Sequence, residues 1–255
     1  MKKEMMQQNA KKNEVIALNR KRLLNNDTPF AIREAYVKLR TGLMFCMTAD
    51  KERPCTSFAV TSAKPSEGKS LTAANIAISY AMLGKKVLLI DADMRKPTQR
   101  RLWRVEKPTG LCDFLAKISK LELDKVKDLP LWIVCTGTIP PNPSELLSSE
   151  RMKHFVEESA KVYDYIIIDT PPINTVADAQ IVSTYVDGVV LVVKSGDTTQ
   201  DELNEAIDAV RRAGGNLCGT VLNDLNMKSV KYAYKYKYGG KYGYKYSYSE
   251  SYEAR

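Results

Sequence analysis

Three aspartates stand at the ends of apolar runs, where a carboxylate needs a cation nearby. Asp91 and Asp93 follow the run Val87–Ile90, and Asp169 follows the run Tyr165–Ile168. A buried carboxylate is poorly tolerated unless a positive charge approaches it, and Mg²⁺ bridging phosphate groups would supply that charge. Magnesium nucleotide needs one or two protein carboxylates, so a third could accept a proton from an incoming hydroxyl. The plainer alternative is that each aspartate caps a helix or lies in a surface turn.

A segment upstream of these aspartates matches a phosphate-binding loop. It follows the pattern G-x-x-x-x-G-K-[ST] except at its first position, where alanine replaces glycine. The expected nucleotide-binding residues are Ala63, Lys64, Pro65, Ser66, Glu67, Gly68, Lys69, Ser70 and Leu71. In such a loop, backbone N–H groups cradle phosphate oxygens, the lysine meets the β- and γ-phosphates, and the hydroxyl that follows binds Mg²⁺. A chance match in a turn before a helix is the alternative.

The second loop position, Lys64, allows two interpretations. Some dimeric P-loop ATPases carry a lysine here that reaches the nucleotide of the partner subunit. In this chain Pro65 and Ser66 replace the two glycines that usually follow. The replacement favours an exposed loop lysine over one that crosses to a partner.

The elements that must position these residues form an alternating series. The expected strands are Thr56–Thr61, Lys86–Ile90, Leu131–Cys135, Tyr165–Ile168, Gly188–Lys194 and Asn216–Asn223. The expected helices are Ile32–Met47, Leu71–Leu83, Gly110–Lys117, Leu123–Lys127, one or two within Pro143–Lys161, Ala177–Val186 and Gln200–Ala213. Because the strands are apolar throughout, they predict a mostly parallel sheet flanked by helices on both faces, the α/β fold of P-loop nucleoside triphosphatases. Ligands of such sheets bind outside the carboxyl ends of the strands, where the loop and the aspartates fall.

Composition narrows the class of protein. The 255 residues are 44% hydrophobic, enough for one α/β domain, and five scattered cysteines without a C-x-x-C pair indicate reduced thiols in a cytoplasmic protein. His154 is the single histidine, which excludes a histidine-rich metal site, and no apolar run approaches the roughly 20 residues of a membrane span. Of the net charge of +9, residues 1–53 carry +6, residues 228–255 carry +5 and the middle of the chain carries −2. Basic ends of this kind attract acidic partners.

The C-terminal 28 residues contain a tyrosine repeat and no Leu, Ile or Phe. The tyrosines are Tyr232, Tyr234, Tyr236, Tyr238, Tyr242, Tyr244, Tyr246, Tyr248 and Tyr252. A segment of this composition builds no core, so we expect a disordered tail. A tyrosine can accept a phosphate on its hydroxyl, form hydrogen bonds or stack its ring on a base, so the tail by itself leaves three uses open.

Together these features resemble the bacterial tyrosine kinase family, particularly the cytosolic kinases of capsular and exopolysaccharide operons. The resemblance covers roughly residues 28–255. It is carried by the phosphate loop Ala63–Ser70, the second aspartate motif Leu88–Arg95, the strand Ile166–Asp169, the segment Thr138–Leu147 and the tyrosine tail.

The resemblance implies ATP-dependent autophosphorylation of tail tyrosines between neighbouring subunits. It places Lys69 and Ser70 on phosphate and Mg²⁺, Asp91 as the base toward the tyrosine hydroxyl, and Asp93 and Asp169 in support of Mg²⁺. Two further residues are placed by the resemblance. Arg95 holds phosphate or the acceptor segment, or else forms a surface salt bridge, and Asn223 lies near the adenine site.

The family also assembles into rings through a Glu-x-x-Arg-x-x-Arg helix motif. Here Glu34 and Arg40 match, Val37 stands in the place of the first arginine, and Lys38 lies beside it, about 100° further round the helix. The implied partners are further copies of the chain, a membrane-spanning activator that recruits the chain to the inner face of the membrane, and a cognate tyrosine phosphatase. The expected organisation is a flexible basic arm over residues 1–27, a kinase domain over 28–225 with its oligomerisation helix at 28–47, and the tail over 226–255.

Two other functions fit parts of the sequence. A dimeric ATPase switch of the septum-site or partitioning type shares the loop and the strand-end aspartates, although its membrane-binding members carry a tail helix with aliphatic residues. A single-strand nucleic-acid binder would use alternating lysine and tyrosine. Nucleic acid is disfavoured as a partner because it leaves Asp91 and Asp93 unexplained.

Overall fold

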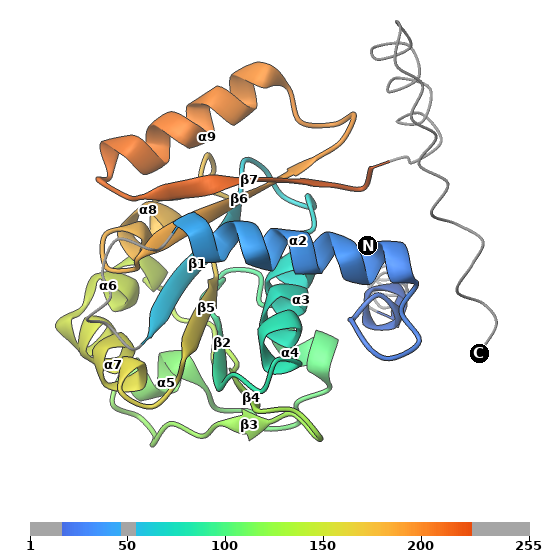
Figure 1. Cartoon of the computed structure of the whole chain (residues 1–255). Helices are drawn as coiled ribbons and strands as arrows, with labels where there is room; N and C mark the ends of the chain where they lie inside the picture. Colours follow the sequence, from blue (N-terminus) through green and yellow to red (C-terminus); the bar gives the residue numbers. More distant parts are fainter. Residues whose placement is uncertain (1–16, 47–54, 226–255) are drawn as a thin grey trace, which may run out of the picture. The chain divides into compact units, whose positions relative to one another are not determined.

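The computed structural model describes residues 17–46 and 55–225 (Figure 1). By its internal contacts the chain divides into two units, Met1–Asn223 and Asp224–Arg255. The predicted tail and residues 1–16 of the predicted arm lie outside the described residues. None of the helices in the described part is long and apolar enough to cross a membrane.

The first unit is built on one sheet, which has seven strands within the described residues, in the order β3-β4-β2-β5-β1-β6-β7. Its strands are β1 (Thr56–Ser62), β2 (Val87–Asp91), β3 (Asp124–Lys125), β4 (Leu131–Val134), β5 (Tyr165–Asp169), β6 (Gly188–Lys194) and β7 (Leu217–Asn223). All neighbours run parallel except β3, which pairs antiparallel with β4. The central strands are buried on both faces, which confirms the mostly parallel sheet predicted from their apolar sequences.

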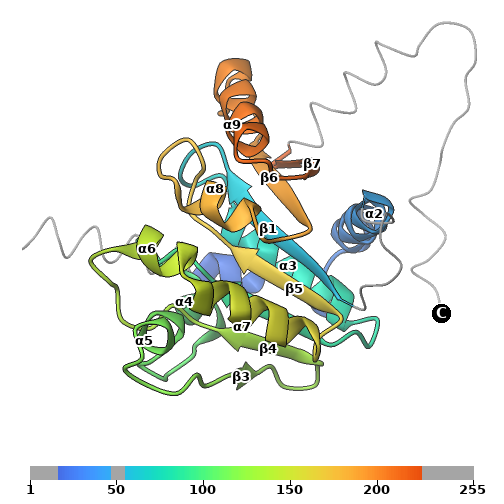
Figure 2. The same ribbon diagram turned by 90° about the vertical axis from the view of Figure 1, so that its left-hand side faces the viewer.

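Helices cover both faces of this sheet (Figures 1 and 2). The helices are α2 (Phe30–Cys46), α3 (Lys69–Ala81), α4 (Gln99–Trp103), α5 (Leu111–Leu115), α6 (Pro143–Ser148), α7 (Glu150–Ala160), α8 (Asp178–Ser183) and α9 (Gln200–Arg212). One hydrophobic core joins the sheet to α2, α3 and α4, and a second joins its other face to α5 through α9. This arrangement confirms the predicted fold class of a P-loop α/β domain.

Three local predictions need correction. The segment Leu123–Lys127, predicted as a helix, contains the short strand β3, because pairing with β4 decides its conformation. The short helix α4 was not predicted. Part of the predicted mobile arm is packed on the domain: Leu24 is buried, its N–H donates to Asn75 Oδ1 at 2.9 Å, and Arg20 donates to the carbonyl of Arg101.

Candidate active site

The phosphate-binding loop joins the end of β1 to the start of α3, as its sequence predicts. Because β1 is almost completely buried, the loop starts from a fixed point, and the first N–H groups of α3 lack intrahelical partners. Ser66 and Gly68 have φ angles of 69° and 91°. Ala63 is not among the described residues with positive φ, so the backbone conformation at this position does not require glycine. Pro65 and Ser66 are exposed, and Leu71 is half-buried in the first turn of α3.

Glu67 and Asn223 hold this loop against the rest of the sheet. The buried carboxylate of Glu67 accepts hydrogen bonds from the Lys64 N–H at 2.9 Å and from the Thr198 hydroxyl. The side-chain amide of Asn223, at the end of β7, donates to the Glu67 carbonyl at 2.9 Å. Asn223 therefore lies against the loop. The tie to Thr198, on the connection between β6 and α9, was not predicted.

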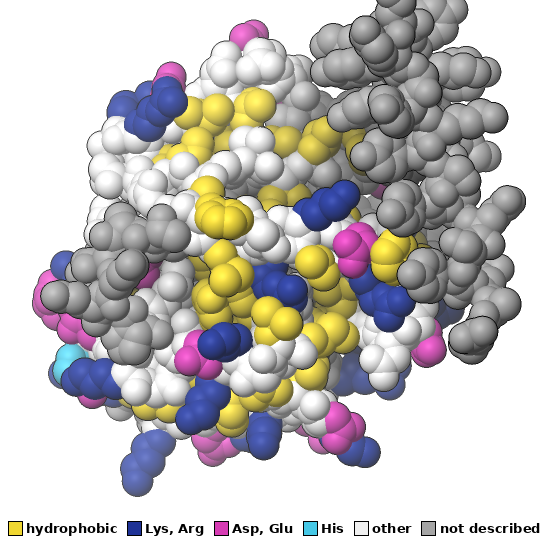
Figure 3. All heavy atoms as spheres, viewed as in Figure 1, with side chains coloured by type: hydrophobic (Ala, Val, Ile, Leu, Met, Phe, Trp, Pro, Cys, Tyr) yellow, Lys and Arg dark blue, Asp and Glu magenta, His cyan; other side chains and the backbone are white. Residues whose placement is uncertain are grey.

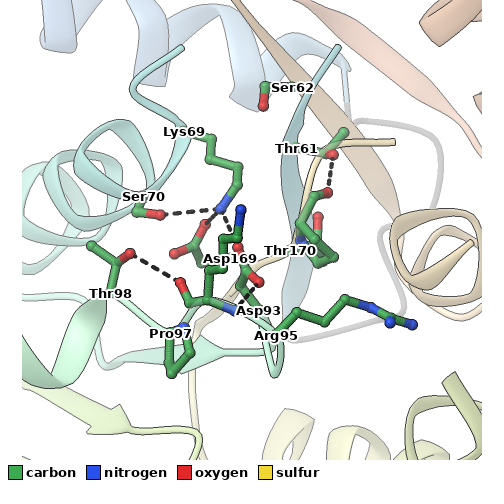
Figure 4. Close-up of polar contacts among 12 residues, drawn as sticks. Thr61, Ser62, Lys69, Ser70, Asp93, Arg95, Pro97, Thr98, Asp169 and Thr170 are labelled. Atoms are coloured by element: carbon green, nitrogen blue, oxygen red, sulfur yellow. Dashed lines mark hydrogen bonds and ion pairs between the residues drawn. The ribbon is translucent and has the colours of Figure 1, made fainter. Parts of the chain in front are cut away.

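Lys69 points into the group of aspartates (Figure 4). Its Nζ lies 2.8 Å from Asp93 Oδ2, 3.6 Å from Asp169 Oδ1 and 3.3 Å from Ser70 Oγ, and only 10% of its side chain is exposed. Burial alone would lower the pKa of the ammonium, but the carboxylates of Asp169 and Asp93 outweigh that effect and raise the pKa. Lys69 therefore stays charged at neutral pH and balances carboxylates that would otherwise be uncompensated.

Asp91 and Asp169 end neighbouring strands and lie opposite each other in the register of β2 and β5. Both are completely buried. Asp91 Oδ2 accepts the N–H groups of Thr98 at 3.0 Å and Gln99 at 2.8 Å, and Asp169 Oδ2 accepts Nε2 of Gln99 at 2.9 Å. Oδ1 of each carboxylate has no hydrogen-bond partner among the described groups. Burial raises the pKa of both aspartates, and the charge of Asp169 raises the pKa of Asp91 further.

This arrangement fits a divalent cation that also binds a nucleotide phosphate. Within the described residues no group of three His, Cys, Asp or Glu side chains could hold a metal unaided. Mg²⁺ does not need one, because it is usually held by one or two carboxylates together with water and substrate phosphates. Asp93 and Asp169, with the Ser70 hydroxyl beside Lys69, offer that donor set, and the buried Oδ1 of Asp169 has no hydrogen bond.

Two basic residues that the sequence placed at the nucleotide are engaged elsewhere. Arg95 forms a bidentate contact with the fully buried Asp178, with Nε to Oδ2 at 2.8 Å and Nη2 to Oδ1 at 3.1 Å, and it points away from Lys69 (Figure 4). This geometry corresponds to the salt-bridge alternative for Arg95. Lys64 Nζ lies 3.1 Å from Glu202 Oε2 and donates to the Asp197 carbonyl at 2.8 Å, as an exposed loop lysine would.

The residues expected to mediate oligomerisation lie on α2. Glu34 is half-buried and Lys38 is exposed. Arg40 instead braces α2 on α3 within the same chain, because its Nη1 donates to the Ser79 carbonyl at 2.6 Å. Its charge therefore has a structural partner already.

The tight contact between Gly68 and Asn223 leads to a prediction. A Cβ at position 68 would lie 2.1 Å from Asn223 Nδ2, and the backbone there has a φ of 91°. We expect Gly68→Ala to lower the free energy of unfolding by about 2–4 kcal/mol through left-handed strain and overpacking, and to weaken ADP binding at least about tenfold, because a misplaced loop cannot direct its N–H groups at phosphate. Urea unfolding and calorimetry measure the two effects.

The double variant Gly68→Ala/Asn223→Ala separates these causes. Removing the Asn223 amide relieves the clash but leaves the backbone strain. The double variant should therefore have a free energy of unfolding only about 1–2 kcal/mol below that of Asn223→Ala alone. A Gly68→Ala protein as stable as the wild type would show that the loop has a different conformation.

Comparisons with known proteins agree with this geometry. Residues 56–216 match the AAA domain family. The tyrosine-protein kinase YwqD of Bacillus subtilis (strain 168) is 42% identical over 223 residues, which span 86% of this chain and 90% of that protein. The kinase domain of the Escherichia coli tyrosine kinase ETK superposes with a TM-score of 0.74 at 31% identity, covering 88% of this chain and 82% of that one.

A cell division protein shares the fold, at a greater distance. The MinC:MinD complex of Aquifex aeolicus gives a TM-score of 0.58 at 26% identity, over 70% of this chain and 72% of that one. Both the sequence identity and the structural match are higher for the kinases. On these grounds this chain belongs to the family of bacterial tyrosine-protein kinases.

Proposed function

We propose that this chain is an ATP-dependent protein-tyrosine autokinase, which transfers the γ-phosphate of ATP to tail tyrosines of neighbouring subunits. The observation that carries the proposal is the third buried carboxylate. Asp93 and Asp169 suffice for Mg²⁺, while Asp91 is fully buried beside them with Oδ1 unpartnered. A related ATPase switch can carry the same aspartates, but this chain also has nine tail tyrosines, and Asp91 can serve as the base for their hydroxyls.

Each residue of the site has a separate role in the proposed phosphoryl transfer. The N–H groups of the loop and the Lys69 ammonium bind and orient the phosphates, and Ser70, Asp93 and Asp169 would hold Mg²⁺, whose charge polarises the transferred phosphoryl group. Asp91 accepts the proton of the tyrosine hydroxyl as its oxygen forms a bond to the γ-phosphorus. The bond from that phosphorus to the bridging oxygen breaks, and ADP leaves. Burial excludes water from Asp91, which favours transfer to tyrosine over hydrolysis.

The tail suits the role of acceptor by its charge. Its nine tyrosines lie outside the described residues, and residues 228–255 carry a net charge of +5. A basic acceptor is attracted to a site containing three aspartates, and each phosphotyrosine adds about −1.5 to −2 charge, so about three modifications would cancel the attraction. Phosphorylation would thereby help the product to leave.

The adenine base we assign to the side of the loop next to Asn223. A surface pocket there is lined by Lys194, Thr199, Leu203 and Leu222, among others. It is open to solvent, which suits the proposal that the cytosolic end of a membrane-spanning activator completes the nucleotide site. Such an activator would recruit the chain to the inner face of the membrane, where it would regulate capsular or exopolysaccharide synthesis, opposed by a cognate tyrosine phosphatase.

Assembly of copies we assign to α2. Hydrophobic side chains are exposed on the face of the molecule that contains it (Figure 3). On the helix itself, Phe30, Ile32 and Met44 are 68%, 47% and 50% exposed. Glu34 and Lys38 supply charges on the same helix, while Arg40 fixes the helix on α3. A homo-oligomer formed in this way, a ring in this family, would deliver the tail of one subunit to the site of the next.

Mass spectrometry of the tail tests the proposed activity. The full chain is incubated with Mg²⁺ and ATP together with the cytosolic segment of the activator, and phosphate is expected on tyrosines between Tyr232 and Tyr252. A variant with all nine tail tyrosines changed to phenylalanine should bind ATP and remain unlabelled. ATP hydrolysis without tyrosine phosphate under these conditions would reject the kinase and favour an ATPase switch of the septum-site type.

A further inference from the structure

Gln99 contacts all three parts of the proposed site. It is the first residue of α4 and is completely buried. Its side-chain Nε2 donates to the Ser70 carbonyl at 2.9 Å and to Asp169 Oδ2 at 2.9 Å. Its backbone N–H donates to Asp91 Oδ2 at 2.8 Å. One residue thus joins the first turn of α3 after the phosphate loop, the end of β2 and the end of β5.

Trp103 fixes which way the Gln99 amide points. Its indole N–H, one helical turn further along α4, donates to Gln99 Oε1 at 3.0 Å. An indole N–H can only donate, and the Ser70 carbonyl can only accept. A flipped amide would place its oxygen against the Ser70 carbonyl and a carboxylate oxygen of Asp169, and its NH₂ against the indole N–H. Trp103 therefore selects the orientation that presents the donor to Asp169.

The contacts with Gln99 leave the other oxygen of each carboxylate available. Oδ2 of both Asp91 and Asp169 is held by a Gln99 donor, and Oδ1 of both has no hydrogen bond within the described residues. Because the two oxygens of a carboxylate are fixed by one plane, holding Oδ2 sets the direction of Oδ1. Oδ1 of Asp169 lies 3.6 Å from Lys69 Nζ, at the place where a cation belongs.

We propose that Gln99 is a positioning residue: its side-chain amide, locked by Trp103, orients Asp169 toward Mg²⁺, while its backbone N–H helps to hold Asp91. The part concerning Mg²⁺ rests on the proposed nucleotide site but not on kinase activity, since a related ATPase would need the same orientation. The competing explanation is that Gln99 only starts α4 and fills space. A structural residue of that kind would affect stability without changing how binding depends on Mg²⁺.

The test uses the full chain with Trp132→Phe, so that Trp103 is the single tryptophan. In this background Gln99→Met keeps the side-chain length and removes the donor to Asp169. Calorimetry of ADP binding at several Mg²⁺ concentrations should show that the half-saturating Mg²⁺ concentration rises about 10- to 100-fold, as is typical when a group that orients a metal ligand is lost. ADP binding in EDTA, which depends on the loop and Lys69, should change less than about twofold. Tyrosine phosphorylation should fall about 10- to 100-fold.

Trp103 emission gives a readout independent of turnover. We expect the emission to change when Mg²⁺ and ADP are added, because the indole N–H is hydrogen-bonded to the amide that contacts Asp169. Gln99→Met should abolish this change. The milder variant is Trp103→Phe, made with Trp132 retained. It leaves the Nε2 donor in place but frees the amide to flip, so its Mg²⁺ requirement should rise only a few-fold.

Leu102→Ala is the matched control, because it removes a buried apolar contact from the same helix and touches none of these hydrogen bonds. It should destabilise the fold and leave the Mg²⁺ dependence unchanged. Wild-type Mg²⁺ dependence in both Gln99→Met and Trp103→Phe would overturn the proposal, as would an equal defect in Leu102→Ala. A shifted Mg²⁺ dependence in a chain that never labels its tyrosines would support the positioning role and reject only the kinase.

Discussion

Replacement of Lys69 by methionine is expected to lower the rate of tail phosphorylation by about 10³-fold or more, the loss typical when a preorganised charge at a phosphoryl group is removed. Lys69 is the single basic side chain within 4 Å of both Asp93 and Asp169 in the described part of the chain. Without its ammonium the phosphates would meet three buried aspartates with no lysine to offset their charge. Phosphotyrosine formed from radiolabelled ATP measures the rate.

The same substitution has a second expected effect, on stability. Lys69 is nearly buried and pairs with two buried carboxylates, so its removal leaves their charge uncompensated. Breaking a buried pair by removing one partner typically costs about 3–5 kcal/mol. We therefore expect a lower free energy of unfolding in urea, and circular dichroism must show that the variant is folded under the assay conditions.

Lys85→Met is the matched control for Lys69→Met. Lys85 is exposed between α3 and β2, and the same side-chain change there should alter neither labelling nor unfolding by a measurable amount. Labelling of folded Lys69→Met at the wild-type rate would reject the assignment of the phosphate loop. It would leave the fold unaffected, because β1 and α3 are established by burial rather than by this side chain.

The sequence predicted most of what positions this site. The apolar runs of β1, β2, β5 and β6 could be recognised because a strand buried on both faces has no polar side. The aspartates at the ends of β2 and β5 indicated a cation site. Their sequence did not show that β2 and β5 are neighbours, which brings Asp91 opposite Asp169. Strand order depends on packing between distant segments, and one chain does not encode it in a local pattern.

Features that depend on tertiary contacts were missed or misread. The helix α4 has five residues and three polar ones, too few to show a helical period. Gln99 looks like any polar residue until α4 places its amide between Ser70 and Asp169. For Arg95 the sequence left phosphate binding and a salt bridge both open, because the partner of its guanidinium, Asp178, lies 83 residues further along the chain.

The second large effect is expected for Asp91→Asn, which should slow tyrosine phosphorylation by about 10²–10⁴-fold, the contribution typical of a general base. The substitution preserves size, and the amide oxygen of asparagine can accept the same N–H groups of Thr98 and Gln99 that Oδ2 accepts. ADP binding should therefore change little, because Lys69 and the loop are untouched. A variant that keeps the wild-type rate would show that Asp91 is not the base.

Although Asp91→Asn should be slower than the wild type, it should be more stable, and the difference in stability should depend on pH. Burial, then the charge of Asp169, raises the pKa of Asp91 from 3.8 to about 8, so the folded protein binds this proton more tightly than the unfolded chain does. The wild type is favoured most below pH 4, where the carboxyl is protonated in both states. Its stability relative to Asp91→Asn then falls as pH rises to about 8, by up to 1.4 kcal/mol per pH unit, and stays low above that.

Urea unfolding of both proteins in EDTA, without nucleotide, between pH 5 and pH 9 measures this difference. Across that range we expect the free energy of unfolding of Asp91→Asn to rise relative to that of the wild type, by an amount on the order of several kcal/mol at most. Parallel curves would show that Asp91 ionises as freely in the folded chain as in the unfolded one. A variant that is more stable and nearly inactive would indicate that Asp91 is retained for catalysis at a cost in stability, since a carboxylate kept for structure alone would not destabilise the fold that contains it.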